Sequence, residues 1–155
     1  MDFTDWMLAL HLIAAFAVAA ALVLYSVLVF SGRRMQTLEE TRTLFRIAPV
    51  GGVLVAAGMV LVFVLGVILA LDSDTFDLWD GWIIAAIVLL IATGGVGQRT
   101  GAYYMDVQKL AEEPGGGNEA EVLARLRAPT GAVLHFATVA LFVLIVLDMI
   151  YKPGA

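Results

Sequence analysis

Residues 129–153, PTGAVLHFATVALFVLIVLDMIYKP, decide the fold. They are almost entirely apolar, and a helix of this length crosses a lipid bilayer, which takes about 20 residues. At membrane depth the run places two ionisable side chains, His135 and Asp148. Because such groups are energetically expensive inside a membrane, we expect any site to lie where this helix meets its neighbours.

The rest of the chain repeats this apolar pattern. Of its 155 residues, 61% are hydrophobic and 15% are charged, whereas about a quarter of the residues in a soluble domain are charged. Asp5 and Asp80 stand where helix N-caps are expected, and Pro49 and Pro129 stand at first-turn positions. The sequence therefore predicts one all-α domain, residues 1–155, built as a four-transmembrane-helix bundle. We place the spans near residues 6–31, 48–71, 81–102 and 129–151.

The basic residues predict the orientation of the bundle. Every Lys and Arg except Lys152 follows the first or the third span: Arg33, Arg34, Arg42, Arg46, Arg99, Lys109, Arg125 and Arg127. The loop between the second and third spans has four acids and no base: Asp72, Asp74, Asp77 and Asp80. Basic loops stay in the cytoplasm, so we expect a multi-pass protein of the cell inner (plasma) membrane with both termini outside. Trp6, Trp79 and Trp82 then fall at the outer boundary, where interfacial anchors belong.

The two basic segments are predicted to contain short cytoplasmic amphipathic helices. Thr37-Leu38-Glu39-Glu40 matches a capping box that opens a helix toward Arg46. The third span should continue as a helix to about Glu113, where the run 114–117 stops it, and Asn118 could cap a last helix. The apolar residues of that last helix, Val122, Leu123 and Leu126, are more typical of packing under the bundle or against lipid than of a partner site.

Small residues recur at helical spacing in two spans. Thr93, Gly97 and Gly101 repeat every four residues. Three glycines fall near one face of the second span: Gly51, Gly58 and Gly66. Such spacing lets helix backbones approach closely in lipid, within the bundle or between protomers.

Several classes of function lack their signatures. The chain has no cysteine, which removes disulfides, thiolate metal sites and cysteine nucleophiles. It has no phosphate-binding loop, dinucleotide fingerprint or nucleic-acid signature, and no paired carboxylates or nucleophile with a base. Ion-coupled transporters place ionisable groups at the membrane midplane, which is nearly free of polar groups here, so a pump is disfavoured.

The two histidines lie at different depths. His11 is roughly 8 Å below the outer end of its helix and His135 roughly 9 Å above the inner end of its own, which leaves about 15 Å between their levels. Imidazoles that share one metal are about 4 Å apart, so one metal between them is not expected. His135 and Asp148 also point about 140° apart around their helix and do not serve one site.

An outer group of residues has two interpretations. Met7 and His11 share a helical face, and Met149 and Asp148 arrive at the same depth. Histidine and methionine could bind copper or haem b as cofactor ligands, with Asp148 orienting the imidazole. Alternatively, His11 hydrogen-bonds Asp148 or a backbone carbonyl while the methionines fill space.

An inner polar cluster is also expected. His135 should meet residues that arrive from the ends of the first and third spans: Tyr25, Ser26, Gln98 and Arg99. These groups could simply satisfy one another, or Arg99 could build a pocket for a small anion or a lipid headgroup.

Three stretches carry a resemblance to a known family. They are Leu10-His11-Leu12-Ile13-Ala14-Ala15, Trp79-Asp80-Gly81-Trp82 and the ending from Asp148 to Gly154. The chain resembles a bacterial family of predicted integral membrane proteins, a domain of unknown function, and its layout is similar to the copper-resistance D-type membrane proteins. The resemblance implies a four-helix inner-membrane protein and supplies no established activity. Phe16-Ala17-Val18-Ala19 stands where an aromatic and glycine pair would be expected.

Two functional hypotheses follow. The first is a non-enzymatic membrane protein that acts by packing in the bilayer, as a homo-oligomer or as an accessory subunit of a partner membrane protein. The second is a membrane redox or metal-handling protein that uses the outer histidine and methionine residues.

Overall fold

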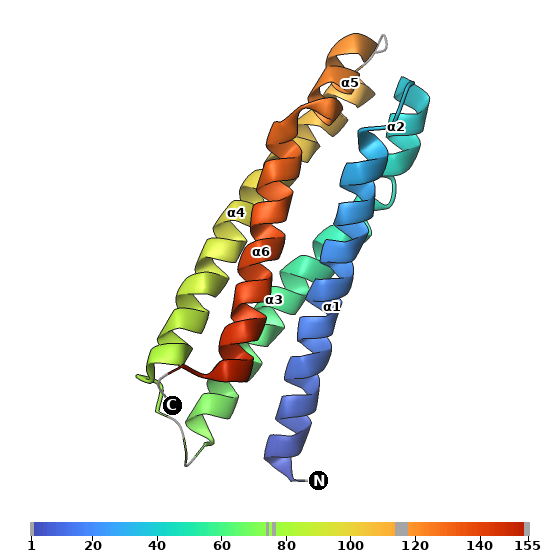
Figure 1. Cartoon of the computed structure of the whole chain (residues 1–155). Helices are drawn as coiled ribbons and strands as arrows, with labels where there is room; N and C mark the ends of the chain where they lie inside the picture. The colour runs from blue at the N-terminus through green and yellow to red at the C-terminus, as the bar shows by residue number, and fades with distance from the viewer. Residues whose placement is uncertain (1, 74, 76, 114–117, 154–155) are drawn as a thin grey trace.

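The computed structural model describes residues 2–73, 75, 77–113 and 118–153, and these residues are helical wherever they form regular secondary structure. The helices are α1 (Phe3–Gly32), α2 (Leu38–Phe45), α3 (Ala48–Leu71), α4 (Gly81–Glu112), α5 (Glu119–Arg127) and α6 (Pro129–Tyr151) (Figure 1). Four helical stretches, around α1, α3, α4 and α6, are long and apolar enough to cross a membrane. The prediction of an all-α fold with four such helices is confirmed. The predicted stop at 114–117 lies outside the described residues, as do Asp74 and Gly154.

The helix bounds follow the local signals closely. The spans predicted at 48–71 and 129–151 coincide with α3 and α6, and α4 runs on to Glu112. The N-cap of α1 is Asp2 rather than the predicted Asp5: the Asp2 carboxylate accepts from the Asp5 N–H, and the Asp5 carboxylate accepts from the Asp2 N–H. This reciprocal box starts the helix one turn earlier. Thr37 caps α2 as predicted, because its hydroxyl oxygen accepts from the Glu40 N–H at 3.3 Å.

The long helices pack as two pairs, α1 with α3 and α4 with α6, and contacts between the pairs are fewer. Glycines of α3 make the first pairing close. A β-carbon built at Gly58 would lie 2.6 Å from Cγ2 of Val18, and one built at Gly51 would lie 3.0 Å from the Tyr25 ring. The predicted close approach at these α3 glycines is therefore present, and it joins α3 to α1.

The most extensive buried cluster lies at one end of the bundle, where α2 and α5 fold over the last turns of α4. We call this region the cap. Its buried members are Leu38, Phe45, Val107, Ala111, Val122, Leu123 and Leu126. The predicted packing of the α5 apolar residues under the bundle is confirmed, since Val122 is fully buried.

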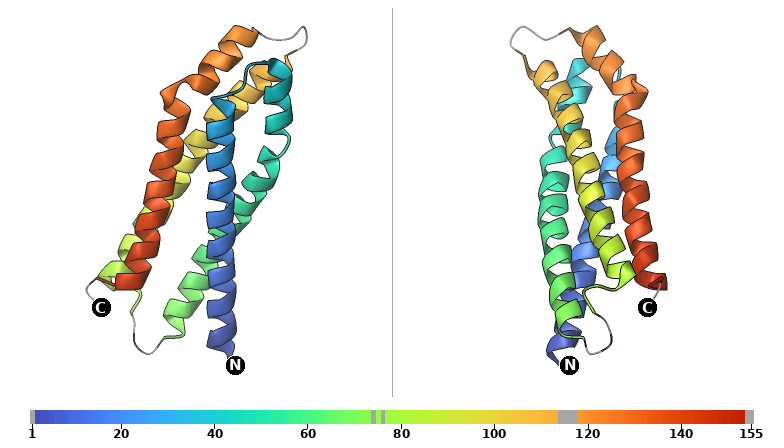
Figure 2. Two further views of the ribbon diagram at one scale, coloured as in Figure 1. Left: turned by 45° about the vertical axis from the view of Figure 1, so that its right-hand side comes forward. Right: turned by 90° about the vertical axis from the view of Figure 1, so that its left-hand side faces the viewer.

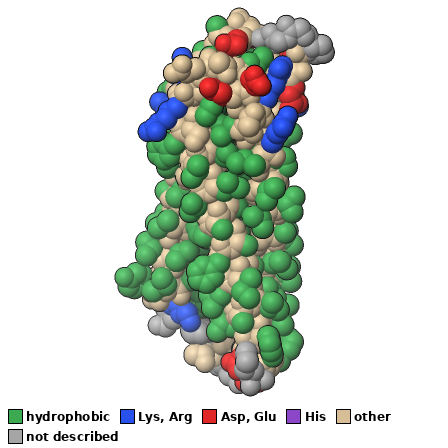
Figure 3. Space-filling view, turned by 90° about the vertical axis from the view of Figure 1, so that its right-hand side faces the viewer, with side chains coloured by type: hydrophobic (Ala, Val, Ile, Leu, Met, Phe, Trp, Pro, Cys, Tyr) green, Lys and Arg blue, Asp and Glu red, His purple; other side chains and the backbone are tan. Residues whose placement is uncertain are grey.

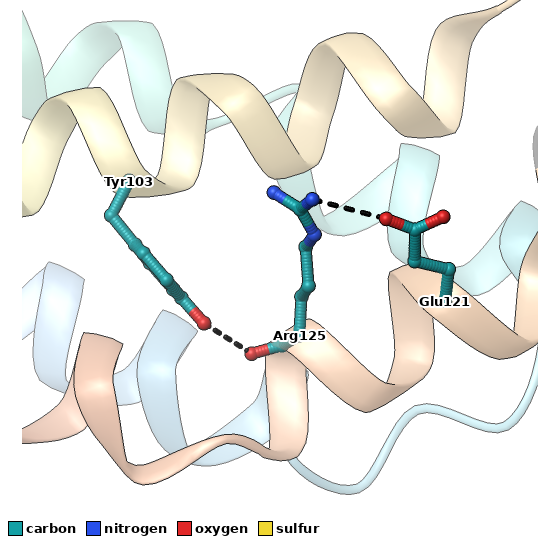
Figure 4. Close-up of polar contacts among 3 residues, drawn as sticks. All are labelled: Tyr103, Glu121 and Arg125. Atoms are coloured by element: carbon teal, nitrogen blue, oxygen red, sulfur yellow. Dashed lines mark hydrogen bonds and ion pairs between the residues drawn. The ribbon is translucent and has the colours of Figure 1, made fainter.

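Hydrogen bonds between elements hold the cap in place. The Tyr103 hydroxyl donates to the Arg125 carbonyl oxygen at 2.6 Å, and the Arg125 guanidinium pairs with Glu121 at 3.0 Å (Figure 4). The Arg127 guanidinium donates to the Met35 carbonyl oxygen, and Arg42 Nε donates to the Ala111 carbonyl oxygen at 2.8 Å. Basic side chains thus donate hydrogen bonds to backbone carbonyl oxygens near helix ends, which have no partner within their own helix.

The opposite end of the bundle, with Phe3 and Tyr151, holds both described chain ends (Figure 1). We call it the terminal end. Toward it the α1–α3 pair and the α4–α6 pair diverge, as the two views of Figure 2 show. The side chains that join α1 to α6, Ser26 with His135 and Phe30 with Phe136, lie in the half nearer the cap.

Large apolar side chains cover the lateral surface between the two ends (Figure 3). Phe16 is 71% exposed and Ile91 is 70% exposed. Only 6% of the most apolar window of the α3 stretch is buried, so most of that helix faces outward. An apolar surface of this extent does not belong in water, and it suits a lipid environment.

Candidate functional site

A cavity of about 620 Å³ lies between the two helix pairs in the half of the bundle nearer the cap. This volume falls in the range of small-molecule sites, about 300–1,000 Å³. Its lining comes mainly from α1, α3 and α4. The other helices add Leu44 and Phe45 of α2, Leu126 of α5, and His135 and Thr138 of α6. Of the described residues that line it, none carries a formal charge.

His135 is the most distinctive group in the lining. Its side chain is 2% exposed, and its Nε2 lies 2.8 Å from the Ser26 hydroxyl oxygen. That hydroxyl lies 2.9 Å from the Leu22 carbonyl oxygen and donates its one hydrogen to it. With the Ser26 hydrogen on Leu22, Nε2 carries the imidazole hydrogen and donates to Ser26, and Nδ1 is the acceptor of the ring.

Three other hydroxyl groups of the lining donate their hydrogens to backbone carbonyls. Thr93 donates to the Leu89 carbonyl oxygen at 2.7 Å, and Thr138 donates to the Leu134 carbonyl oxygen at 3.0 Å. The Tyr25 hydroxyl donates to the Ala48 carbonyl oxygen at 3.0 Å. Because a hydroxyl has one hydrogen and two lone pairs, these groups offer acceptors to the cavity and no donors.

The mouth of the cavity opens between α3 and α4, which make few contacts with each other. Lining residues of both helices are exposed there: Gly52 and Ala56 on α3, and Gln98, Gly101 and Met105 on α4. A molecule could therefore enter sideways, through the apolar lateral surface.

The glycines of α4 lie along this cavity. A β-carbon built at Gly101 would meet nothing within 4 Å, and one at Gly97 would lie at an ordinary 3.6 Å from Cγ2 of Thr138. Within the chain, Gly97 therefore contacts α6 and Gly101 borders open space, and the predicted contact of this row between protomers stays a prediction. The tightest approach of the α4–α6 pair is at Gly131, where a β-carbon would lie 2.6 Å from the Tyr104 hydroxyl oxygen.

The structure brings together four of the five residues proposed for the inner polar cluster. Tyr25, Gln98 and His135 line the cavity, and Ser26 bonds His135. Arg99 is exposed and is not part of the lining, so it does not contribute a cation to this site. Sequence reasoning missed Tyr104, a lining residue two positions beyond the predicted end of the third span.

The outer residues are divided between the two helix pairs. Met7 and His11 lie on α1, where His11 packs against α3: its Cε1 would be 3.2 Å from a β-carbon at Gly66, and its ring interacts with the Val62 backbone. Asp148 and Met149 lie on α6, which pairs with α4. His11 Nδ1 and Asp148 Oδ2 are both buried without a hydrogen-bond partner, so they do not bond each other through these atoms.

Within the described residues, no group of three or more His, Asp or Glu side chains is placed to hold a metal ion. Comparison with family models, with curated proteins and with solved structures finds no match. The resemblance to the bacterial family of unknown function therefore stays a prediction.

Proposed function

We propose that this chain is an integral membrane protein of the cell inner (plasma) membrane, with the cap in the cytoplasm and both termini outside. The distribution of charge supports the orientation. The cap and the nearby turns hold seven exposed bases: Arg33, Arg34, Arg42, Arg46, Lys109, Arg125 and Arg127. Lys152 lies at the terminal end. Retention of basic segments in the cytoplasm favours this arrangement, with α2 and α5 as cytoplasmic amphipathic helices.

Single cysteines should report the orientation, because the native chain has none. Ser73→Cys, in the connection between α3 and α4, should react with an impermeant maleimide in intact cells. Ala120→Cys, exposed on α5, should react only after the cells are permeabilised. Mass tagging on a gel measures both. The reverse pattern would place the cap outside and refute the orientation.

We further propose that the protein is non-enzymatic and acts by lateral association, as a homo-oligomer or as an accessory subunit of another membrane protein. The observation that carries this proposal is the small buried share of the spanning helices, which is lowest for α3 at 6% of its most apolar window. The part of α3 that does not face α1 is therefore available for other helices or lipid.

The mass of the particle extracted from native membranes tests lateral association. Extracted in mild detergent, the chain should run as an integer multiple of its 16.6 kDa mass or with a stoichiometric partner. Native mass spectrometry distinguishes these two assemblies. A particle that contains one copy of the chain and no partner, also in lipid nanodiscs, would contradict the proposal.

A second candidate function is metal or haem binding near His11. The observation in its favour is His11 Nδ1, which is buried without a hydrogen-bond partner. Met7 is one helical turn away on the same face, so a histidine nitrogen and a thioether sulfur could serve copper or haem. Met149, on the other helix pair, would have to move toward α1 to join them.

Metal and haem content separates the two candidate functions. After growth with copper and haem, we expect purified wild-type protein to be colourless and free of stoichiometric metal. Absorption spectra and elemental analysis would be recorded beside His11→Ala and Met7→Leu, purified in the same way. Stoichiometric copper or haem in the wild type that both variants lose would establish the second function instead.

A further inference from the structure

We propose that the cavity between the helix pairs is a binding site for a neutral membrane-soluble molecule with an apolar body and a hydroxyl head, and that His135 Nδ1 accepts the hydrogen of that head. This inference goes beyond lateral association and rests only on the placement of the chain in a membrane. It is argued from three features of the cavity: its charge, its hydrogen-bonding groups and its mouth.

The charge of the lining selects against ionic head groups. None of the described lining residues is charged, and Arg99, the base proposed for an anion, is exposed and does not line the cavity. A phosphate, carboxylate or ammonium group inside the cavity would lose its hydration without gaining an opposite charge. The site therefore favours a neutral ligand.

The acceptor on His135 favours a head that donates a hydrogen, and Gln98 and Tyr104 of the lining can donate to the oxygen of the same head. At the buried floor, the hydroxyls of Thr93, Thr138 and Tyr25 donate to backbone carbonyls, and Ser26 donates to Leu22. His135, at 2% exposure, uses Nε2 in its contact with Ser26, which leaves Nδ1 to accept from a ligand. A ligand hydroxyl that donates to this nitrogen adds one hydrogen bond in apolar surroundings. A ketone or an ether has no hydrogen to give.

The position of the mouth sets the route by which a ligand enters, and the small residues set the shape of the cavity. Gly52, Ala56 and Gly101 border an opening on the lateral surface rather than at the ends of the bundle. An apolar molecule dissolved in the bilayer reaches it without crossing water. Gly97 and Gly101 have no side chains, so a slot stays open beside α4. A β-carbon built at Gly101 would point into this slot and would meet no protein atom within 4 Å.

Binding of two matched probes tests the site. Radiolabelled 4-octylphenol and its methyl ether differ only in the donor hydrogen. Each would be titrated into the protein in phosphatidylcholine nanodiscs, with empty nanodiscs as the measure of partitioning. We expect saturable binding of the phenol, about tenfold tighter than that of the ether, the size of one net hydrogen bond. Equal affinities, or partitioning alone for both, would overturn the proposal.

Two glycine variants locate the binding. Gly101→Leu should fill the slot and abolish saturable binding of both probes. Gly95→Leu is the matched control, since a β-carbon there also meets nothing within 4 Å and Gly95 does not line the cavity. It should bind like the wild type. If Gly101→Leu binds both probes like the wild type, the probes bind outside this cavity and the proposal is wrong. If a second copy of the chain covers the mouth, the wild type will bind neither probe and Gly101→Leu will dissociate the oligomer, which also overturns the proposal.

His135→Phe tests the acceptor. It should lower phenol affinity to that of the ether and leave ether affinity unchanged, because the ether never donated to the ring. A purely structural role for His135 would lower both affinities together and would refute the assignment of the acceptor. Cysteine labelling at Ser73 and Ala120 reports the orientation separately, so failure of the cavity and failure of the proposed topology are distinguishable.

Discussion

Gly58→Leu should separate α1 from α3 and lower the free energy of unfolding by about 3 kcal/mol, near the upper end of overpacking effects. Even a β-carbon at this position would lie 2.6 Å from Cγ2 of Val18, which is 1% exposed, and 3.3 Å from the Ala14 carbonyl oxygen. A carbonyl on a packed helix cannot move aside without moving the helix. The measurement is thermal unfolding in detergent, followed by circular dichroism.

Gly95→Leu is the control for this prediction. Position 95 is exposed on α4 and has open space around it. Leucine is also a better helix former than glycine, by up to about 1 kcal/mol. We expect its melting temperature to equal or exceed that of the wild type. If Gly58→Leu melts like Gly95→Leu, the α1–α3 contact is not as close as the structure places it.

The spans could be predicted because membrane helices depend on local properties. Length, apolarity and the position of proline are properties of a segment, and they placed α3 and α6 at their observed bounds. The difference at α1 has a local cause as well: Asp2 and Asp5 form a reciprocal box, and only one of them can be the N-cap. The spacing of the α3 glycines likewise predicted a close helix contact, and α1 is the helix that makes it.

The site depends on which helix pairs with which, and that choice has no local signal. Gly97 and Gly101 have the same spacing whether they border a neighbouring helix or an open slot. The slot arises because α4 packs on α6 through Gly131 and leaves α3 to α1. His11 was predicted to meet Met149 because the two residues lie at the same depth in the membrane. Depth does not show on which side of the bundle each helix lies. His135 with Ser26 was predictable because both lie at the same depth and near the same end.

Val122→Asp should release α5 from the cap and expose it to trypsin. Val122 is fully buried among Phe45, Val107 and Ala111. A carboxylate there would lose its hydration without a partner, which costs several kcal/mol per ion. A cap destabilised by about 3 kcal/mol opens roughly 100-fold more often. Cleavage after Arg125 and Arg127 should accelerate by that factor, because a protease cuts the locally unfolded state.

Ala124→Asp is the matched control, two residues away on the exposed face of α5. It adds the same charge to the same helix, so an effect of charge on trypsin itself would appear in both variants. We expect its cleavage rate to stay within about twofold of the wild type, as for most exposed substitutions. Mass spectrometry of the fragments from protein in nanodiscs identifies the cut sites. The spanning helices make their own pair contacts, so Val122→Asp should keep most of its helical circular dichroism while α5 is cut. Equal cleavage of the two variants would mean that α5 is held by its hydrogen bonds from Tyr103 and to Met35 rather than by the apolar core of the cap.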